Sequence, residues 1–465
     1  MLALFINRND NIPLIRQIYE QIRLRILHGE LCQGERLPST RDLAESLSVS
    51  RNVVLEAYDQ LIAEGYMTSR QGSGTYVAEG AYWHTSYLDQ SLDLNRNQAT
   101  EMKYDKSLID FRFGVPALDL FPKKKWSQMY QNVCADSPSS AFGYGAPEGC
   151  LELRQVLSHY LVKTRGVYCE PEQVIITTGA IQAIYLVANQ MLSARDKLVT
   201  EDPLNINIRR IFLNTGADVL SIAVDEQGIR ADLVPININL KLIYTTPSHQ
   251  FPLGSTLSVQ RRIELLKIAR QTGCYILEDN YDNEFRFEGT PVSTLQGLDP
   301  ERVIYTGTFS KILSPALRIG YLIVPPKLIS EFRRLKNLLD HHSPTLNQLA
   351  LARFIEQGYF ERHIAKMKKV YKRRQEAILK GCGSYFPERV KVTGNSTGLH
   401  LIVEFNDVIF TDEVLGKLKK AGVNVYPVEM YAVNKGCYNN KIMLGYGNVN
   451  EEEIIEGIKR IKSVL

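Results

Sequence analysis

The N-terminal part of the chain carries apolar residues at helical spacing. Ile18, Ile22 and Ile26 recur every four positions, as on the buried face of an amphipathic helix. Ser39 and Ser50 each precede a further set of this kind, and serine is a favoured N-cap residue. Three short helices are therefore expected, with these inner faces: Ile15, Ile18, Tyr19, Ile22 and Ile26; Leu43, Ala44 and Leu47; Val54, Ala57, Tyr58, Leu61 and Ile62.

The residues after Gly65 alternate as in a β-hairpin. Residues 66–68 and 75–77 predict two short strands around a tip that contains Arg70, Gln71 and Gly72. A helix-turn-helix followed by a hairpin predicts a winged helix-turn-helix domain over residues 1–78. Residues 79–108 have few aliphatic side chains and no sustained period, which is typical of a linker.

From residue 109 to residue 465, short apolar runs alternate with helical segments. This alternation predicts an α/β domain with a mostly parallel central sheet covered by helices. Residues 390–465 indicate strands and a final helix, so a smaller C-terminal α+β lobe is expected there. The strands expected in the large sheet are Val174–Thr177, Lys197–Thr200, Lys241–Thr245, Tyr275–Glu278, Val303–Thr306 and Gly320–Val324.

Length and composition agree with a globular protein of several domains. The chain has 465 residues, 44% of them hydrophobic, and no apolar run approaches the ~18–20 residues that span a membrane. The N-terminal segment lacks the features of a secretory signal. Seven cysteines without metal-ligand spacing favour reduced thiols in a cytoplasmic protein, and no metal site is expected.

The N-terminal domain has the pattern of a DNA-binding module. The second helix of a helix-turn-helix enters the major groove with its N-terminal end, and Ser50, Arg51 and Asn52 begin that helix here. Residues 1–78 hold eight Arg, no Lys and nine acidic residues, so phosphate binding would depend on arginines gathered on one face. On pattern alone, a helical interaction module remains the alternative. The further DNA-binding candidates are Arg36, Arg41, Arg70, Gln71 and Gly72.

A family resemblance favours DNA binding over the interaction module. The stretch LPSTRDLAESLSVSRNVVLEAYDQLIAEGY and the GSGTYV hairpin that follows closely resemble the winged helix-turn-helix of GntR-type regulators. The resemblance covers nearly all of residues 1–78. It implies a double-stranded operator DNA as partner.

The stretch from Thr306 to Gly320 places a lysine shortly after a predicted strand. Lys311 is positioned to form a Schiff base, and Ser310 and Arg318 would flank a phosphate. This combination points to pyridoxal 5′-phosphate (PLP). Asp279 ends another predicted strand and could hold a pyridine nitrogen protonated, while Tyr281 could bond the 3′ oxygen of the ring.

A strand that runs into a helix offers a second phosphate-binding element. The backbone N–H groups of Gly179, Ala180 and Ile181 and the dipole of the helix suit an anion. Each signal is weak by itself, since most lysines are solvated charges and Asp279 could be a helix N-cap. The order of these residues along the chain is what indicates a cofactor site.

The same ordered set resembles the fold-type-I aminotransferases over residues 109–465. GYGAPEGCLELR resembles their dimer-crossing loop, which implies a homodimer in which Tyr144 reaches the partner's phosphate. PSHQFPLG and EDNYDNEFRF resemble the MocR-type subgroup of GntR regulators. In that subgroup a winged helix is fused to an aminotransferase-like domain that binds PLP, and the protein regulates transcription.

Two departures from the aminotransferase pattern bear on activity. Asn205 follows Glu201-Asp202-Pro203-Leu204, where an aromatic residue that stacks on the cofactor ring is expected. Residues 439–446 contain no arginine to clamp a substrate carboxylate; Lys441 is the candidate effector contact there, or a surface residue.

The departures favour a regulator that senses PLP or an amino compound and has no catalytic residues beyond the Schiff-base lysine. A catalytically active aminotransferase with an appended DNA-binding module is the alternative. The sequence does not specify the effector, the operator, or whether transcription is activated or repressed.

Overall fold

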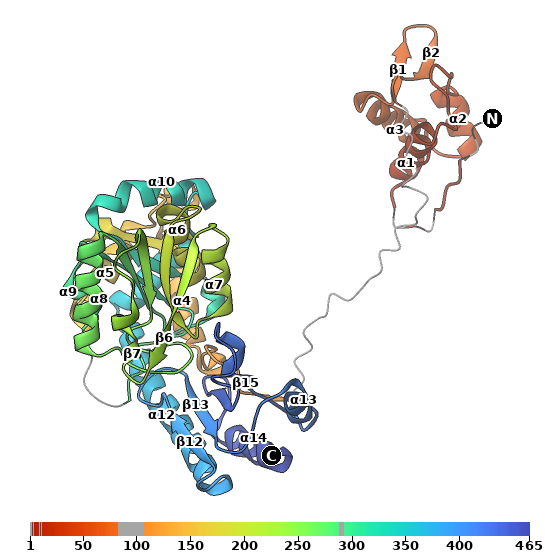
Figure 1. Ribbon diagram of the computed structural model, residues 1–465. Helices are drawn as coiled ribbons and strands as arrows, with labels where there is room; N and C mark the ends of the chain where they lie inside the picture. Colours follow the sequence, from red (N-terminus) through yellow and green to blue (C-terminus); the bar gives the residue numbers. More distant parts are fainter. Residues whose placement is uncertain (1, 3, 9, 11, 82–106, 288–292) are drawn as a thin grey trace. The chain divides into compact units, whose positions relative to one another are not determined.

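The structure is a computed structural model that describes residues 2, 4–8, 10, 12–81, 107–287 and 293–465 (Figure 1). The chain divides into two compact units, Met1–Tyr104 and Asp105–Leu465. Most of the linker expected over residues 79–108 lies outside the described residues. No helix of the described residues is long and apolar enough to cross a membrane.

The N-terminal unit contains the three helices and the hairpin that the sequence predicts. The helices are α1 (Leu14–Leu27), α2 (Thr40–Leu47) and α3 (Arg51–Ala63), and β1 (Met67–Arg70) pairs antiparallel with β2 (Gly74–Val77). The hydroxyl of Ser39 caps α2 by accepting the N–H of Asp42 at 3.2 Å. Ser50 is the N-cap of α3, but its side chain makes no capping hydrogen bond.

One apolar core holds this unit together. Ile18, Ile22, Val54 and Leu61 are completely buried in it, which confirms the helical faces read from the sequence. The segment before α2 joins the hairpin, since the N–H of Leu37 donates to the carbonyl of Thr75 at 2.9 Å. This bond ties the second strand of the hairpin to the segment that leads into α2.

An eight-stranded sheet forms the centre of the larger unit in the described part of the chain. Its order is β4-β11-β10-β9-β8-β5-β6-β7, and the neighbours from β10 to β6 run parallel. β11 runs antiparallel to both of its neighbours, as does β7 to β6. The strands are β4 (Val174–Thr177), β5 (Lys197–Asp202), β6 (Asp218–Asp225), β7 (Gly228–Ile229), β8 (Leu240–Thr245), β9 (Tyr275–Asn280), β10 (Val303–Thr308) and β11 (Gly320–Ile323).

The sheet is buried on both faces. Neighbouring residues of one strand point to opposite sides, so Leu242 joins one core and Ile243 the other. This arrangement explains the continuous apolar runs in the sequence, which are typical of strands covered by helices on both sides. Figure 1 shows α8 and α9 at one side of the sheet and α7 at the other.

The remaining helices of this unit frame the sheet and lead to the C-terminal lobe. The long helix α12 packs against the last helix, α14. The helices are α4 (Lys123–Asp136), α5 (Leu151–Arg165), α6 (Ala180–Met191), α7 (Ile206–Leu213), α8 (Val259–Thr272), α9 (Leu295–Leu298), α10 (Ile329–Asp340), α11 (Thr345–Glu356), α12 (Tyr359–Tyr385), α13 (Asp412–Lys420) and α14 (Glu451–Val464).

The smaller lobe is built around a second sheet in the order β12-β13-β16-β15, all antiparallel. The sequence correctly predicts strands and a final helix over residues 390–465. It does not reveal that β3 (Ile109–Asp110) pairs parallel with β14 (Val423–Asn424), which brings the start of the unit into this lobe. The other strands are β12 (Val390–Thr393), β13 (His400–Phe405), β15 (Tyr426–Pro427) and β16 (Lys441–Gly445).

Candidate cofactor pocket and nucleic-acid interface

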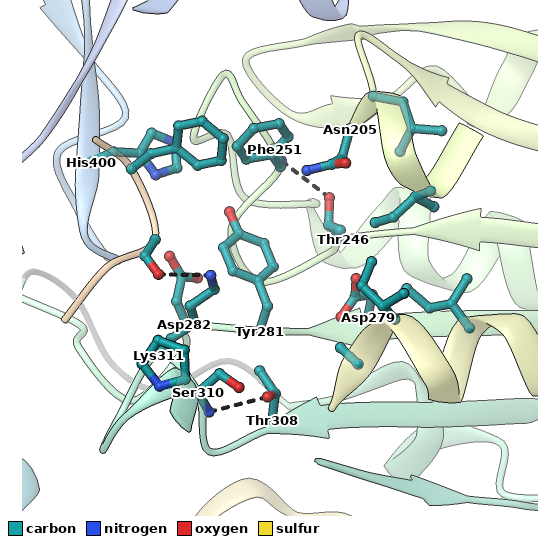
Figure 2. A pocket seen from close by; sticks show the side chains of 18 of the residues that line it. Asn205, Thr246, Phe251, Asp279, Tyr281, Asp282, Thr308, Ser310, Lys311 and His400 are labelled. Atoms are coloured by element: carbon teal, nitrogen blue, oxygen red, sulfur yellow. Dashed lines mark hydrogen bonds between the residues drawn. The ribbon is translucent and has the colours of Figure 1, made fainter. Parts of the chain in front are cut away.

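A pocket opens at the carboxyl edge of the large sheet. The parallel strands β5, β8, β9 and β10 all end there, which is where open α/β sheets bind ligands. The start of β11 reaches the same edge because this strand runs in the opposite direction. The pocket is lined by Phe113, Gly114, Ala180, Ile181, Ile184, Leu204, Asn205, Ile208, Tyr244, Thr246, Phe251, Asp279, Tyr281, Asp282, Thr308, Ser310, Lys311, Pro315, Arg318 and His400 (Figure 2).

Lys311 reaches the pocket from the turn after β10. Its Nζ donates to the carbonyl of Gly114 at 2.7 Å. Gly114 has a φ of +65°, and a Cβ at this position would lie 2.7 Å from the Lys311 Nζ. The positive φ favours glycine, and a side chain at this position would displace the Lys311 amine. Burial lowers the pKa of Lys311, which favours the neutral amine that reacts with aldehydes.

Asp279 projects from β9 on the other side of the pocket. Its Oδ2 accepts the hydroxyl of Tyr244 at 2.7 Å, while its Oδ1 is buried and has no hydrogen-bond partner among the described residues. Burial raises the pKa of this carboxyl to about 7. A buried, unpartnered carboxylate oxygen is costly, so this atom calls for a ligand that brings a donor or a positive charge.

Ser310 and Arg318 bound the pocket near the first turn of α6. Arg318 donates through Nη2 to the carbonyl of Thr178. Gly179 is the N-cap of α6, and a Cβ on it would lie 3.2 Å from the Arg318 Nη2. Ala180 and Ile181 line the pocket at the start of this helix. The guanidinium and the helix N-terminus together suit an anion.

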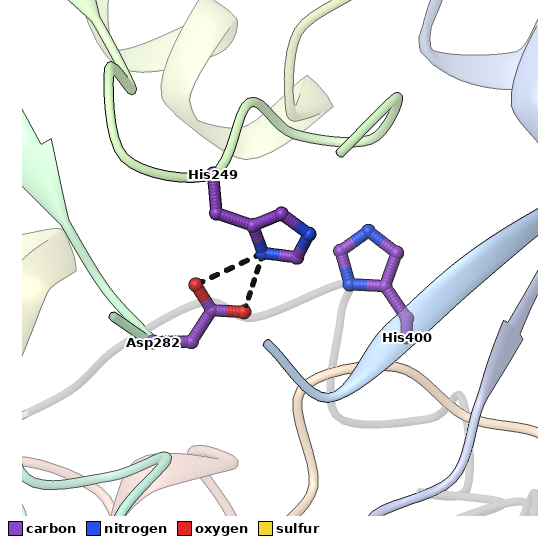
Figure 3. Close-up of side chains that lie close together, drawn as sticks. All are labelled: His249, Asp282 and His400. Atoms are coloured by element: carbon purple, nitrogen blue, oxygen red, sulfur yellow. Dashed lines mark hydrogen bonds and ion pairs between the residues drawn. The ribbon is translucent and has the colours of Figure 1, made fainter. Parts of the chain in front are cut away.

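Three buried polar side chains form a cluster at one side of the pocket (Figure 3). His249 Nδ1 lies 2.8 and 3.0 Å from the two carboxylate oxygens of Asp282, and His400 Nε2 lies 2.9 Å from the carbonyl of Pro252. Because these partners only accept, both nitrogens are donors. Ligand atoms of the three side chains lie within 4.8 Å of one another, and the expectation of no metal remains a prediction.

Tyr281 connects this cluster to the pocket. Its hydroxyl lies 3.3 Å from His249 Nδ1, and the two rings stack with centroids 6.0 Å apart. Gly398 packs against the cluster with a φ of +87°, and a Cβ there would lie 2.2 Å from the Cε1 of His249. Burial and the neighbouring His249 lower the pKa of His400 to about 3, so His400 is neutral.

The pocket residues meet the requirements of PLP. Lys311 offers a partly buried amine for the aldehyde, and the unpartnered Oδ1 of Asp279 suits a protonated ring nitrogen. Arg318 and the start of α6 suit the phosphate. The structure thus brings Lys311, Asp279, Tyr281, Ser310 and Arg318 to one pocket, as the sequence predicts.

Three other predicted residues have different surroundings. Asn205 lines the pocket, but its Oδ1 caps α7 by accepting the N–H of Asn207 at 2.9 Å. Lys441 does not line the pocket and forms an ion pair with Glu404 at 3.2 Å. The ring of Tyr144 is 90% exposed and lies 5.8 Å from that of His341. Lys441 is thus paired within the small lobe, and its contact with an effector stays a prediction, while the ring of Tyr144 is exposed to solvent.

Several pocket residues are not singled out by the sequence reasoning. Gly114, Tyr244 and His400 reach the pocket from distant segments, and no local pattern marks them. His249 and Asp282 lie within PSHQFPLG and EDNYDNEFRF, which are noted above only as family motifs. A histidine or an acidic residue inside such a motif is the sequence signal that could have pointed to these two residues.

The predicted DNA-binding residues are exposed in the N-terminal unit. Arg51 and Asn52 form the first turn of α3, and Arg51 Nε lies 3.3 Å from the hydroxyl of Thr40 on α2. Arg70 stacks over the ring of Tyr76 at 4.9 Å. The other exposed candidates are Arg36, beside β2, Arg41 on α2, Ser50 before α3, and Gln71 and Gly72 at the hairpin tip.

Comparison with protein families assigns both units. Residues 14–77 match the gntR family of bacterial regulatory proteins. Residues 106–461 match the aminotransferase class I and II family. The first match lies within the N-terminal unit, and the second lies within the larger unit.

Full-length relatives share this combination. The chain is 36% identical to the uncharacterized HTH-type transcriptional regulator YdeL of Bacillus subtilis, over 99% of this chain and 98% of that protein. It is 35% identical to the probable rhizopine catabolism regulatory protein MocR of Rhizobium meliloti, over 99% and 95%. A crystal structure of Pyrococcus horikoshii kynurenine aminotransferase matches with a TM-score of 0.72 and 28% identity, covering 82% of this chain and 98% of that one.

Proposed function

Because the chain belongs to the MocR-type subgroup of GntR-family transcription regulators, we propose that its PLP-binding domain controls its occupancy of operator DNA. The effector is PLP itself or an amine that binds at the cofactor. One observation carries this proposal: a reactive amine, an unpartnered carboxylate oxygen and an anion site meet in one pocket. A chain used only for DNA binding has no need for such a pocket.

Each part of the pocket has a role toward the cofactor. When bound, PLP supplies an aldehyde that condenses with primary amines and a ring that withdraws electrons. Lys311 would hold the aldehyde carbon, and Asp279 would keep the ring nitrogen protonated. Arg318 and the first turn of α6 would hold the phosphate, and Tyr281 would bond the 3′ oxygen. The positive charge of the protonated ring nitrogen would offset the cost of burying the Asp279 carboxylate.

The N-terminal unit reads DNA from the start of α3. Arg51 and Asn52 are exposed there, and the contact of Arg51 with Thr40 orients its guanidinium beside α2. The hairpin tip adds Arg70, whose stacking on Tyr76 fixes its direction. Phosphate contacts set the register of the domain, and base-edge contacts set its sequence preference.

The chain acts as a homodimer through its large unit. Exposed apolar side chains lie on α6, on α10 and in the segment before α5: Phe142, Tyr144, Ile181, Tyr185, Leu338 and Leu339. The segments that carry them are joined, since Tyr144 packs on His341 and Gln182 donates to Asp340 at 2.7 Å. Exposed apolar side chains on segments that contact one another favour a subunit interface. Tyr144 then reaches the partner's cofactor phosphate.

Productive transamination is the second candidate function, and the pocket argues against it. Arg318 is the only arginine that lines the pocket in the described part of the chain, and it serves the phosphate. Asn205 offers no aromatic ring, and its side chain is bound to the backbone of α7. Without a carboxylate clamp and a stacking ring, the orientation that catalysis requires is lost.

The test of this proposal combines two measurements on the full-length protein. PLP is added, the bond to the protein is made permanent with borohydride, and the modified peptide is identified by mass spectrometry. Binding to a DNA fragment selected by the PLP-loaded protein is then measured with and without PLP. We expect modification at Lys311 and a PLP-dependent DNA affinity. Modification at another lysine, or repeated turnover of an amine and a keto acid, would refute the proposal.

A further inference from the structure

One end of the pocket, next to Lys311, offers hydrogen-bond acceptors. Asp282, a residue with an exposed fraction of only 2%, lines it with its carboxylate. His400 has a lone pair on Nδ1 because its Nε2 donates to the carbonyl of Pro252. The low pKa of His400 keeps this ring neutral at physiological pH. This end is the opposite of a carboxylate-binding site, which needs donors or positive charge.

The charges elsewhere in the pocket are already assigned, if the proposed function holds. Besides Asp282, the charged side chains that line it in the described residues are Asp279, Lys311 and Arg318. PLP uses all three, for its ring nitrogen, its aldehyde and its phosphate. Asp282 is therefore the one charged side chain that lines the pocket in the described residues and is not used by PLP, so it is available to bind the effector.

His249 fixes Asp282 for this role. Its Nδ1–H bonds both carboxylate oxygens, at 2.8 and 3.0 Å, and both side chains are buried. A carboxylate oxygen accepts more than one hydrogen bond, so each keeps capacity for a ligand. Figure 2 shows Asp282 next to Lys311, and Asn205, which could donate, away from both.

We propose that Asp282, positioned by His249 and flanked by His400, binds a second donor group of the effector. The effector is accordingly a primary amine whose far end carries an ammonium or hydroxyl group and no carboxylate. The class comprises short diamines and amino alcohols. Phe113 and Phe251, whose ring centroids lie 5.1 Å apart, line the pocket as an apolar wall for the carbon chain between the two groups.

A series of matched amines tests this class. The probes are trimethylenediamine, aminopropanol, propylamine and β-alanine, which differ only in the terminal group. Their affinities for the PLP-loaded full-length protein are measured by calorimetry. A charge-assisted hydrogen bond predicts that the diamine binds about tenfold or more tightly than propylamine. Aminopropanol should fall between them and β-alanine should bind weakest. Equal affinities, or tightest binding of β-alanine, would overturn the proposal.

The Asp282→Asn variant locates the preference. Asparagine keeps an acceptor for His249 and removes the charge. The variant should bind the diamine about as weakly as propylamine. Its affinity for propylamine should stay that of the wild type. An equal loss for both amines would show that Asp282 serves Lys311 and would overturn the proposal. Asp299→Asn is the matched control, since Asp299 is also buried but pairs with Arg270 and does not line the pocket.

Failure of this inference is distinguishable from failure of the proposed function. Absorbance of the bound cofactor is recorded before each titration. A protein that takes up no PLP refutes both proposals. A protein that takes up PLP, changes its DNA affinity, and prefers β-alanine refutes only the role given to Asp282.

Discussion

Burial determines the chemistry of the two ionisable side chains at the centre of the pocket. Desolvation disfavours charge, so it lowers the pKa of Lys311 and raises the pKa of Asp279. A neutral amine is ready to react, and a carboxylate in an apolar site binds a cation strongly. Desolvation thus prepares both Lys311 and Asp279 to bind the same ligand, PLP.

Lys311 carries the first prediction. Lys311→Ala should remove the covalent attachment of PLP and weaken its affinity about tenfold or more, because the remaining contacts are non-covalent. Absorbance titration and borohydride fixation measure both effects. Lys441→Ala is the control, since Lys441 pairs with Glu404 outside the pocket and should leave PLP binding unchanged. Retained fixation in Lys311→Ala would contradict the assignment.

Asp279 gives a prediction for pH dependence. Its pKa in the folded, cofactor-free protein is about 7, above the ~3.9 of an unfolded chain. Between these values the folded state holds the proton, so this group's contribution to the free energy of unfolding falls as pH rises. Asp279→Asn cannot ionise. The stability of the variant relative to wild type should therefore increase from about pH 4 to about pH 7, as followed by thermal unfolding without PLP. A difference that does not vary with pH would exclude a buried, titrating Asp279.

At the scale of elements, strand ends and helix starts place the functional side chains. Four parallel strands deliver Asn205, Thr246, Asp279 and Lys311 to one edge of the sheet, within a few residues of where each strand ends. The start of α3 places Arg51 and Asn52 on the surface of the other unit. Each site depends on where a strand ends or a helix begins, more than on the length of that element.

Strand ends also explain which parts of the site could be predicted from the sequence. Asp279 and Lys311 follow apolar runs, so position along the chain indicates a shared edge. Gly114 and His400 lie far away in the sequence, and only the folding of the small lobe and of residues near β3 brings them to the pocket. The large sheet was predictable for the same reason. Strand β6, the last but one of the sheet, is mostly exposed or partly exposed, and its apolar residues are interrupted by Ser221.

Arg51 provides the prediction for α3. A good bidentate base contact is worth about 1–3 kcal/mol of discrimination. Arg51→Ala should therefore reduce binding to the selected DNA fragment about tenfold or more at constant salt. Arg16→Ala is the control, because Arg16 pairs with Glu20 and stacks over Tyr19, whose hydroxyl bonds Glu64 at the far end of α3. Unchanged affinity in Arg51→Ala would remove this residue from the interface.

At the scale of the whole molecule, domains of two families are joined in one chain, and the proposed dimer would bring two copies of each together. The pocket near Tyr144 is completed by a second copy in the proposed assembly, and each copy brings one DNA-reading unit. Two such units on one dimer favour an operator with two half-sites, spaced by whole helical turns of DNA. An effector that changes the dimer alters how well both half-sites are met at once, and couplings of this kind are typically about 1–3 kcal/mol.

Tyr144 tests the shared site. Tyr144→Ala should lower PLP affinity severalfold in a protein that remains a dimer by light scattering. Tyr168→Ala, which removes another exposed ring that does not line the pocket, should bind PLP as wild type does. A monomeric wild-type protein with full PLP occupancy would contradict the shared site.

The most direct test of the account is the DNA affinity of the full-length protein with and without PLP, in wild type and Lys311→Ala. The fragment is the one selected by the PLP-loaded protein, and salt is held constant because phosphate contacts make the affinity depend on it. The account predicts that PLP changes the affinity of the wild type about fivefold or more, in line with typical allosteric coupling. It predicts little or no change in Lys311→Ala. A wild-type affinity that is the same with and without PLP would contradict the claim that this pocket governs DNA binding.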